Sequence, residues 1–195
     1  MGTDRTAARK RGRPTGVERE RRRDEIIDAA VALFVEHGYQ GVSLDDIAAS
    51  AQVTKRTIYA YIGDRSEIFV AAVERLRLRT LQRAAGPDDT LESLAVEIVG
   101  ALHSDEGVGL HRLMITEASR FDDLAARFYA DGPEAYIAAL RSRLPQPSRE
   151  RAAALFTLLL GERHRQRLLG LRPAPTARQA REQARTALRL LGLGA

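Results

Sequence analysis

Polar and aromatic side chains between Thr54 and Tyr61 have the chemistry needed to contact a nucleic acid. Thr54 is a candidate N-cap residue, so a short helix is expected to begin directly after it. Ile58 points back to a core, and the remaining side chains face outward: Lys55, Arg56, Thr57, Tyr59 and Tyr61. Cations, hydroxyls and phenols of this kind bond the edges of bases and the oxygens of phosphates.

A second short helix is predicted just upstream. Ser43 and Asp46 have the spacing of a capping box, in which each side chain satisfies a free backbone N–H at the helix start. The next apolar residues share one helical face: Leu44, Ile47, Ala48 and Ala51. Two such helices and a turn of three or four residues have the dimensions of a helix-turn-helix. Taken alone, an ordinary corner of a helical domain is an equally good interpretation.

Longer amphipathic helices flank this pair. The upstream helix is expected over residues 18–36 and stops at Gly38, a typical residue for a helix end. Its apolar face is formed by Ile26, Ile27, Ala30, Leu33 and Phe34. The downstream helix opens at Asp64, which has Glu67 at capping-box spacing, and is expected to run to Ala84. Its apolar face is formed by Ile68, Phe69, Ala72, Val73 and Leu76.

With these four helices in place, residues 26–73 resemble the DNA-binding domain of TetR-type transcriptional regulators. The matching positions are Ala29-Ala30, Leu33-Phe34, Gly38-Tyr39, Ser43-Leu44, Ile47-Ala48, Val53-Thr54-Lys55, Thr57-Ile58-Tyr59, Tyr61 and Arg65. Gln52 stands where the family has a turn glycine, Ile62 replaces a phenylalanine and Arg65 a lysine. A positive φ at Gln52 would cost on the order of 1 kcal/mol.

The resemblance implies a role for each polar residue of the two short helices. Thr57, Tyr59 and Tyr61 would contact bases or phosphates, and Thr54 would start the helix that carries them. Lys55 and Arg56 would supply charge, and two further residues would anchor phosphates: Ser43 and Arg65.

The composition suits a soluble protein with a polyanionic partner. The chain has 195 residues, no cysteine and a net charge of +5, of which residues 1–23 alone carry +6. Without cysteine there is neither a disulfide framework nor a thiolate zinc site. No apolar run approaches the ~20 residues of a membrane span. We therefore expect a cytoplasmic protein that spans no membrane and has no signal peptide.

Residues 1–17 lack hydrophobic periodicity and are expected to form a disordered basic arm. The stretch around Arg11 and Arg13 reads Arg-Gly-Arg-Pro and resembles an AT-hook, in which arginines follow the narrow minor groove of A·T-rich DNA. The alternative is a solvated tail with no DNA contact, and phosphate contact alone is a third reading.

The rest of the chain is predicted to be helical, because no stretch alternates as a strand does. Helix starts are expected at Thr90, Ser148 and Thr176, and a hinge at Gly107 and Gly109. Residues 110–140 resemble the ligand-binding domain of AefR-like regulators, with aspartate at position 122 where proline is usual.

The last two helices are expected to form an antiparallel pair, the earlier one ending in a basic, polar continuation over residues 163–167. The final helix has an apolar stripe of Ala180, Ala184, Ala187, Leu188 and Leu191. In TetR-like proteins the matching pair packs against its twofold copy as a four-helix bundle. The alternative is that the stripe belongs to the core of a single chain.

A helical bundle of this kind binds small molecules between its helices. The candidate lining is Leu102, His103, Leu110, Met114, Glu117, Phe121, Phe128, Tyr136 and Phe156. For each residue singly, ordinary core packing is the alternative role. Glu117 has a second alternative as an ion-pair partner of Arg163 or of another arginine. If Glu117 faces a pocket, it would favour a cationic or hydroxyl-bearing ligand.

Catalysis finds little support, since no nucleophile elbow, phosphate-cradling glycine loop or His-Glu-x-x-His motif is present. The four histidines show no tight metal-ligand spacing, and a site of His103, His111 and Glu117 is a remote reading. We expect no enzyme activity, no cofactor and no metal.

Together these features predict an all-α protein with an arm over residues 1–17, a helix-turn-helix domain over 18–80 and an effector-binding and dimerisation domain over 81–195. The expected function is that of a homodimeric transcriptional regulator, more typically a repressor than an activator. It would bind a palindrome in double-stranded DNA and leave it when a small-molecule effector binds. The alternative is an architectural, weakly specific DNA binder that uses the arm.

Overall fold

The computed structural model describes residues 15–85, 89–119 and 122–193, which form helices and connecting turns without a strand in those ranges. The all-α prediction is confirmed. The elements are α1 (Gly16–His37), α2 (Leu44–Ser50), α3 (Lys55–Tyr61), α4 (Arg65–Ala84), α5 (Leu91–Leu102), α6 (Asp105–Glu117), α7 (Asp122–Tyr129), the π-helical turn η1 (Ala130–Glu134), α8 (Ala135–Arg143), α9 (Arg149–Leu168) and α10 (Ala177–Leu190).

Side-chain caps set the helix starts. The predicted N-caps of α2 to α5, α9 and α10 are confirmed, as each accepts a hydrogen bond from the backbone N–H three residues on. One capping box was not predicted: Thr15 Oγ1 accepts from Glu18 N at 3.2 Å, and the Glu18 carboxylate accepts from Thr15 N at 2.7 Å. Helix α1 therefore begins at Gly16, inside the segment expected to be a disordered arm.

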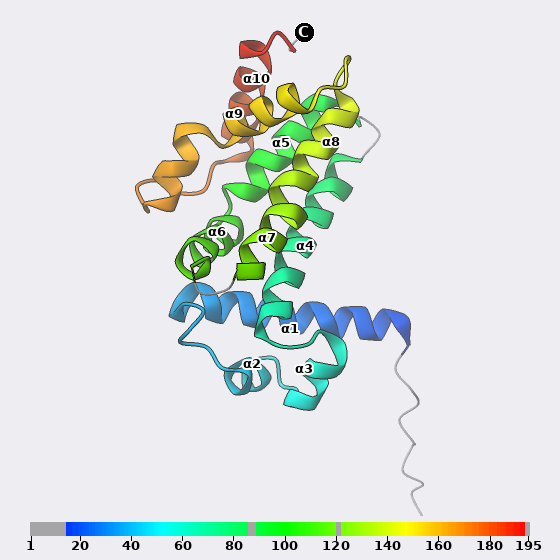
Figure 1. The fold of residues 1–195 in the computed structure, drawn as a ribbon, viewed down its shortest axis with the longest axis vertical. Coiled ribbons are helices and arrows are strands. Elements are labelled where there is room, and N and C mark those ends of the chain that lie inside the picture. The colour runs from blue at the N-terminus through cyan, green and yellow to red at the C-terminus, as the bar shows by residue number, and fades with distance from the viewer. Residues whose placement is uncertain (1–14, 86–88, 120–121, 194–195) are drawn as a thin grey trace, which may run out of the picture.

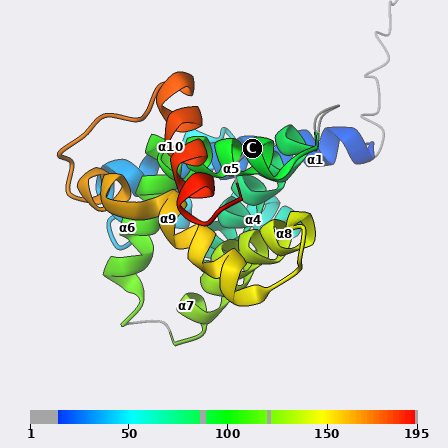
Figure 2. The ribbon, with the colours of Figure 1, turned by 90° about the horizontal axis from the view of Figure 1, so that it is seen from above.

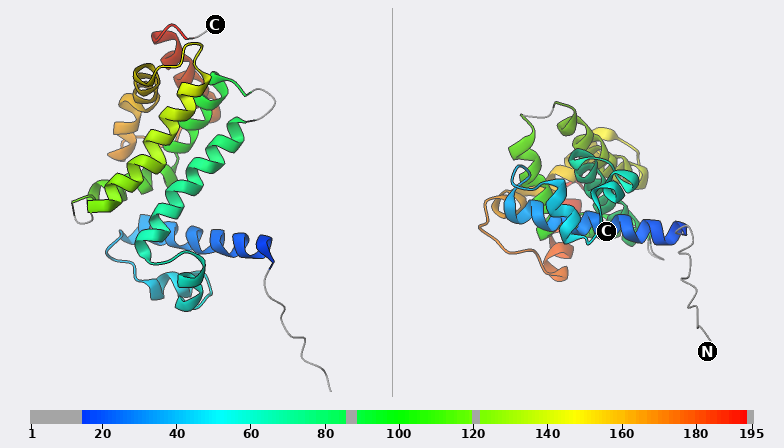
Figure 3. Two further views of the ribbon diagram at one scale, coloured as in Figure 1. Left: turned by 45° about the vertical axis from the view of Figure 1, so that its right-hand side comes forward. Right: turned by 90° about the horizontal axis from the view of Figure 1, so that it is seen from below.

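Helix α4 joins two layers of the molecule. Helix α1 lies across the lower layer with α2 and α3 beneath it, and α4 rises from α3 into the bundle formed by α5 to α10 (Figures 1 and 3). Residues 68–73 of α4 belong to one buried core with α1, α2 and α3, and Ala84 belongs to a second core in the upper bundle. The two cores are thus connected by one continuous helix.

The upper bundle is built around α5. Helix α10 packs along α5, α8 packs on α9, and α4 flanks α5 on another side (Figure 2). The small apolar stripe predicted on the last helix is buried here within one chain, through Ala180, Ala184, Ala187 and Leu188. That stripe is therefore part of the protomer core, and the packing of the last two helices against a twofold copy stays a prediction.

The glycines at 107 and 109 are not a hinge, because both lie inside α6, which Ser104 caps at Gly107 N with a 3.0 Å hydrogen bond. They permit close packing instead. A Cβ on Gly107 would lie 2.4 Å from Ala101 O, and one on Gly109 would lie 2.5 Å from Val35 Cγ2 of α1. Glycine thus lets α6 approach both α5 and the lower layer.

Helix α9 is interrupted at Gly161, whose φ of 55° and ψ of −159° are open almost only to glycine. The segment after this kink was expected to be a basic, polar continuation, and two of its polar residues lie inside the protein. His164 and Arg167 are buried. Arg167 donates to His103 O at 2.9 Å and to the Asp105 carboxylate at 2.7 Å, so it holds the end of α9 against α5 and α6.

The turn between α2 and α3 contains a strained residue. Gln52 has a φ of 53°, whereas Ala51 beside it has an ordinary helical φ of −80°. Because a left-handed conformation costs a non-glycine residue on the order of 1 kcal/mol, Gln52→Gly should raise the free energy of unfolding by about 0.5–1 kcal/mol. Urea denaturation would measure the change.

Ala51→Gly is the matched control, since it adds glycine at the neighbouring position without relieving strain. It should lower the free energy of unfolding. Equal effects of the two substitutions would show that Gln52 carries no strain.

Candidate nucleic-acid interface and ligand pocket

Helix α3 presents one exposed face held in place by its cap. Thr54 Oγ1 accepts from Thr57 N at 3.2 Å, and the two hydroxyls lie 2.9 Å apart. Ile58 is fully buried beneath the helix, which fixes its rotation. Lys55, Arg56 and Tyr59 are exposed, Tyr59 by 59%. The Tyr59 ring is therefore accessible to a partner, on the same helix face as the cations of Lys55 and Arg56.

The other residues predicted to contact DNA already make contacts within the chain. Lys55 Nζ lies 3.1 Å from the Asp45 carboxylate, an exposed ion pair that is worth at most about 1 kcal/mol and is easily exchanged for a phosphate. Tyr61 is half-buried, with the Arg19 guanidinium 5.5 Å above its ring. Ser43 is exposed, but its hydroxyl and N–H both donate to Asp46, at 2.6 and 2.8 Å.

Arg65 is turned into the domain. Its Nη1 donates to Tyr39 O at 3.0 Å and to Val42 O, and its guanidinium lies 4.6 Å from the centre of the Tyr39 ring. Arg65 therefore holds the connection between α1 and α2, which precedes Ser43. Its phosphate contact stays a prediction. Three further predicted residues lie outside the described part of the chain: Arg11, Arg13 and Phe121.

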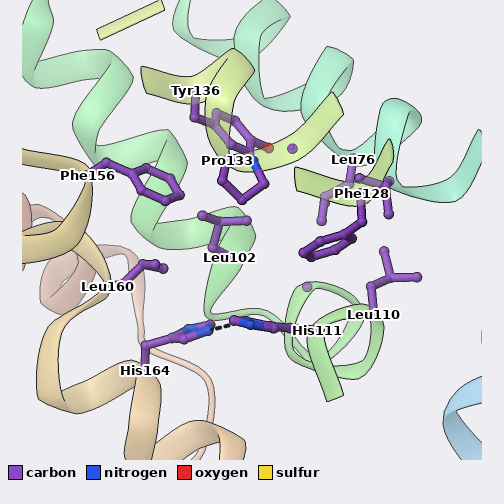
Figure 4. A pocket seen from close by; sticks show the side chains of 13 residues that line it. Leu76, Leu102, Leu110, His111, Phe128, Pro133, Tyr136, Phe156, Leu160 and His164 are labelled. Atoms are coloured by element: carbon purple, nitrogen blue, oxygen red, sulfur yellow. Dashed lines mark hydrogen bonds between the residues drawn. The ribbon is translucent and has the colours of Figure 1, made fainter. Parts of the chain in front are cut away.

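A small pocket of about 50 Å³ lies where α4 to α9 meet (Figure 4). Five predicted residues line it: Leu102, Leu110, Phe128, Tyr136 and Phe156. Sequence reasoning missed the others, which are Val73, Leu76, Gly107, His111, Gly132, Pro133, Leu160 and His164. Gly132 and Pro133 come from the π-helical turn η1, an irregularity of a kind that is frequent at functional sites.

Three predicted lining residues lie elsewhere. Met114 is buried in the lower core, and Glu117 Oε2 accepts from Gln40 Nε2 at 2.8 Å, which ties α6 to the loop after α1. Glu117 is therefore not among the residues that line the pocket. His103 borders a separate cleft beside Arg163 and Arg167. Met114 and Glu117 thus lie at the end of α6 that contacts the lower layer.

Two histidines of the pocket lining are bonded to each other. His111 Nδ1 and His164 Nε2 lie 2.9 Å apart and share a hydrogen bond, and the His103 ring stands 5.0 Å behind that of His164. Burial lowers the pKa of His103 to about 4 and that of His164 to about 3, and it also lowers the pKa of His111. All three imidazoles are therefore neutral at pH 7.

At the other end, Tyr136 donates its hydroxyl to Thr80 Oγ1 at 3.2 Å, and Thr80 donates to Leu76 O at 2.7 Å. Burial raises the pKa of Tyr136 to about 12, so this phenol is neutral as well. Within the ranges that the structure describes, no cluster of three or more His, Cys, Asp or Glu side chains is arranged to hold a metal ion.

Comparison with known proteins agrees with both halves of this geometry. Residues 26–72 match the model of bacterial regulatory proteins of the tetR family, and residues 89–191 match the C-terminal domain of AefR-like transcriptional repressors. The chain belongs to the TetR family. None of the described helices of this TetR-family chain combines the length and apolar character needed to cross a bilayer.

Curated relatives match part of the chain. The chain is 42% identical over 65 residues to the HTH-type transcriptional repressor SCO4008 of Streptomyces coelicolor, which is 33% of this chain and 34% of that one. It is 32% identical over 107 residues to the HTH-type transcriptional regulator SrpR of Pseudomonas putida, covering 53% and 50%. The chain thus spans between about a third and a half of these relatives.

Solved structures match over nearly the whole length. The flavonoid-responsive regulator FrrA is 26% identical with a TM-score of 0.64, over 88% of this chain and 95% of that one. A TetR transcriptional regulator from Agrobacterium tumefaciens is 24% identical with a TM-score of 0.61, over 87% and 93%. The arrangement of the two layers is therefore that of the family.

The neutral histidines make stability depend on pH. Their pKa values in the folded chain lie below the usual 6.5, so the unfolded chain binds more protons between about pH 6.5 and pH 4. The free energy of unfolding should therefore fall on acidification from pH 7 to pH 5, by at most about 1.4 kcal/mol per pH unit and histidine. His103→Gln should make this loss smaller, as urea denaturation at the two pH values would measure.

The exposed His37 gives the matched control. His37→Gln should leave the loss of unfolding free energy between pH 7 and pH 5 unchanged. This pH interval lies above the usual pKa values of carboxylates, so they contribute little to the loss. A loss that is the same in His103→Gln and in the wild type would contradict the assignment.

Proposed function

We propose that this chain is a sequence-specific DNA-binding repressor that acts as a homodimer and leaves its operator when a small molecule occupies the pocket. The observation that carries the DNA-binding part is the exposed face of α3, with Tyr59 between Lys55 and Arg56. The repressors among its relatives support the direction of regulation.

In the proposed complex, α3 of each protomer enters a major groove. Dimers of this kind bind half-sites one DNA turn apart or a multiple of it, about 34 Å for one turn, so the operator is expected to be a palindrome. Tyr59 and Thr57 would contact bases or phosphates, and Lys55 would exchange Asp45 for a phosphate. The basic arm would add phosphate or minor-groove contacts.

Dimerisation is assigned to the outer side of α9 and α10. The buried stripe of α10 is used within the protomer, but Leu158 and Leu190 remain accessible along a groove between the two helices, and Leu190 is 70% exposed. An isologous interface there would place the two DNA-binding layers on the same side of the dimer.

The pocket can act on the DNA-binding layer through helices α6, α7 and α4, which all contribute residues to its lining. Helix α6 carries His111 to the pocket and Gly109 to α1. Helix α7 carries Phe128 to the pocket, and that ring stacks on Phe69 of α4 with centroids 6.1 Å apart. A ligand that prefers one arrangement of these helices shifts the population; a change from 1:99 to 99:1 needs about 5.5 kcal/mol of preference.

The ion pair of Arg127 with Glu67 strengthens the link from α7 to α4. Both terminal nitrogens of Arg127 donate to the Glu67 carboxylate, at 2.9 and 3.0 Å. Glu67 lies in the first turn of α4, next to the Asp64 cap that follows α3. A movement of α7 at the pocket is thereby passed to the end of the recognition helix.

Tyr59→Ala should weaken binding to the operator roughly 10- to 100-fold, because a base or phosphate contact worth about 1–3 kcal/mol is lost. Fluorescence anisotropy with a duplex selected by the wild-type protein would measure it. Tyr129→Ala is the matched control, since Tyr129 is also exposed, by 55%, but lies on α7. Wild-type binding that is equally strong to any duplex would instead support the architectural alternative.

Removing residues 1–14 should weaken DNA binding and reduce its salt dependence, while leaving the Thr15 cap of α1 in place. The deleted segment holds five basic residues. Each lost phosphate contact should reduce the slope of log K against log salt by about 0.9. The measurement is operator binding at a series of salt concentrations. An unchanged slope would show that the arm does not touch DNA.

A further inference from the structure

One arginine at the start of α1 differs from the others in its partner. The acidic partners of the other three are these: Glu25 for Arg21 and Arg22, at 3.7 and 2.9 Å, and Glu74 for Arg23, at 3.7 Å. Arg19 is exposed and forms no ion pair or hydrogen bond through its guanidinium with any residue that the structure describes. Its charge is therefore available to a partner outside the chain.

The Arg19 guanidinium lies over the ring of Tyr61, 5.5 Å from its centre. An ion pair occupies N–H groups of a guanidinium, whereas contact with the face of a ring leaves them available for hydrogen bonds. The neighbouring Glu18 carboxylate is bound to Thr15 N at the start of the helix. Tyr61 belongs to α3, so its ring holds Arg19 beside the recognition helix with its donors unused.

The two ends of α3 lie in different electrostatic surroundings. At the N-terminal end, Lys55 Nζ lies 3.1 Å from the Asp45 carboxylate, and Asp46 follows in the same turn of α2. At the C-terminal end, Tyr61 carries Arg19 of α1. Helix α3 lies nearer than α2 to the N-terminal end of α1 (Figures 1 and 3). A phosphate beside α3 would thus meet two carboxylates at one end and an unpaired cation at the other.

The two residues predicted to anchor phosphates are engaged within the chain. Ser43 donates its hydroxyl and its N–H to Asp46, and these bonds lower the pKa of Asp46, which is therefore charged at neutral pH. A phosphate that approached Ser43 would be repelled by this carboxylate. Arg65 donates to Tyr39 O and Val42 O. Arg19 has neither of these restrictions.

We propose that Arg19, held over the Tyr61 ring, binds a backbone phosphate of the DNA beside the groove that α3 enters. Tyr61 is then a positioning residue, which keeps the guanidinium next to the recognition helix. This inference rests on the proposed function only in placing α3 in a major groove, where the phosphates of the groove wall flank the helix. Arginine suits the contact because its planar group can bond two phosphate oxygens at once.

The salt dependence of operator binding by the full-length protein tests this contact. Arg19→Gln should reduce the slope of log K against log salt by about 0.9 for each protomer, because each loses one phosphate contact. Arg19→Lys retains the charge and should keep most of the wild-type slope. Both replacements have nearly the helix propensity of arginine, so α1 should remain intact. An unchanged slope in Arg19→Gln would overturn the proposal.

Arg22→Gln is the matched control. It removes the same charge from the same helix, but the charge is one that Glu25 already pairs. Its slope should stay close to that of the wild type. An equal fall of the slope in Arg19→Gln and Arg22→Gln would show a general effect of net charge and would overturn the assignment to Arg19.

A double-mutant cycle tests the positioning role of Tyr61. Tyr61→Phe keeps the ring without its hydroxyl, and Tyr61→Leu keeps an apolar side chain without a ring. The weakening of operator binding by Arg19→Gln should be about 2- to 5-fold smaller in the Leu background than in the Phe background, as the loss of a cation–π contact provides. Each comparison is made within one background, so a change in stability caused by Tyr61→Leu cancels. An equal effect in both backgrounds would overturn the positioning role.

Failure of this proposal can be told apart from failure of the proposed function. Phosphates carry no sequence information, so the slope can be measured on a random duplex as well as on the operator. A wild type without operator preference would overturn the proposed function, whereas a lower slope for Arg19→Gln on the random duplex would still support the Arg19 contact. Operator preference in the wild type with an unchanged slope in Arg19→Gln would have the opposite meaning.

Discussion

The buried guanidinium of Arg75 fixes how the two layers of this molecule meet. Arg75 lies on α4 and is 6% exposed, so its charge must be compensated within the protein. Its Nη1 donates to Asp24 O at 2.9 Å, and its Nη2 lies 2.6 Å from the Asp28 carboxylate and 3.4 Å from that of Glu106. The partners come from α1 and α6. One residue therefore ties the DNA-binding layer, the connecting helix and a wall of the pocket together.

Helix α6 is the element that contacts both the lower layer and the pocket. Along its 13 residues it pairs Glu106 with Arg75, places Gly109 against Val35, turns His111 into the pocket and bonds Glu117 to Gln40. Its outer contacts are thus to the lower layer, while its inner ones are to the ligand space. Because a close-packed contact such as that of Gly109 cannot stretch, a shift of α6 has to move α1 or to break the contact.

Local sequence signals predicted the helices of the fold, whereas they did not predict which side chains meet at the pocket. Caps and apolar periodicity placed the helices, because each signal acts within a few residues of its own helix. The glycine at 109 was misread as a hinge, since the reason for it is Val35, 74 positions away. The His111–His164 pair was missed for the same reason, because the two residues are 53 positions apart. Pairings of this kind carry no local sequence signature.

The two irregular places in the upper bundle both serve the pocket. Pro133 cannot donate a helical hydrogen bond, and the π-helical turn η1 absorbs it while bringing Gly132 and Pro133 to the lining. Leu160 and His164, which lie on either side of the kink at Gly161, both line the pocket. The cost of irregular backbone is therefore concentrated where a ligand needs room, which is how strain is commonly distributed between scaffold and site.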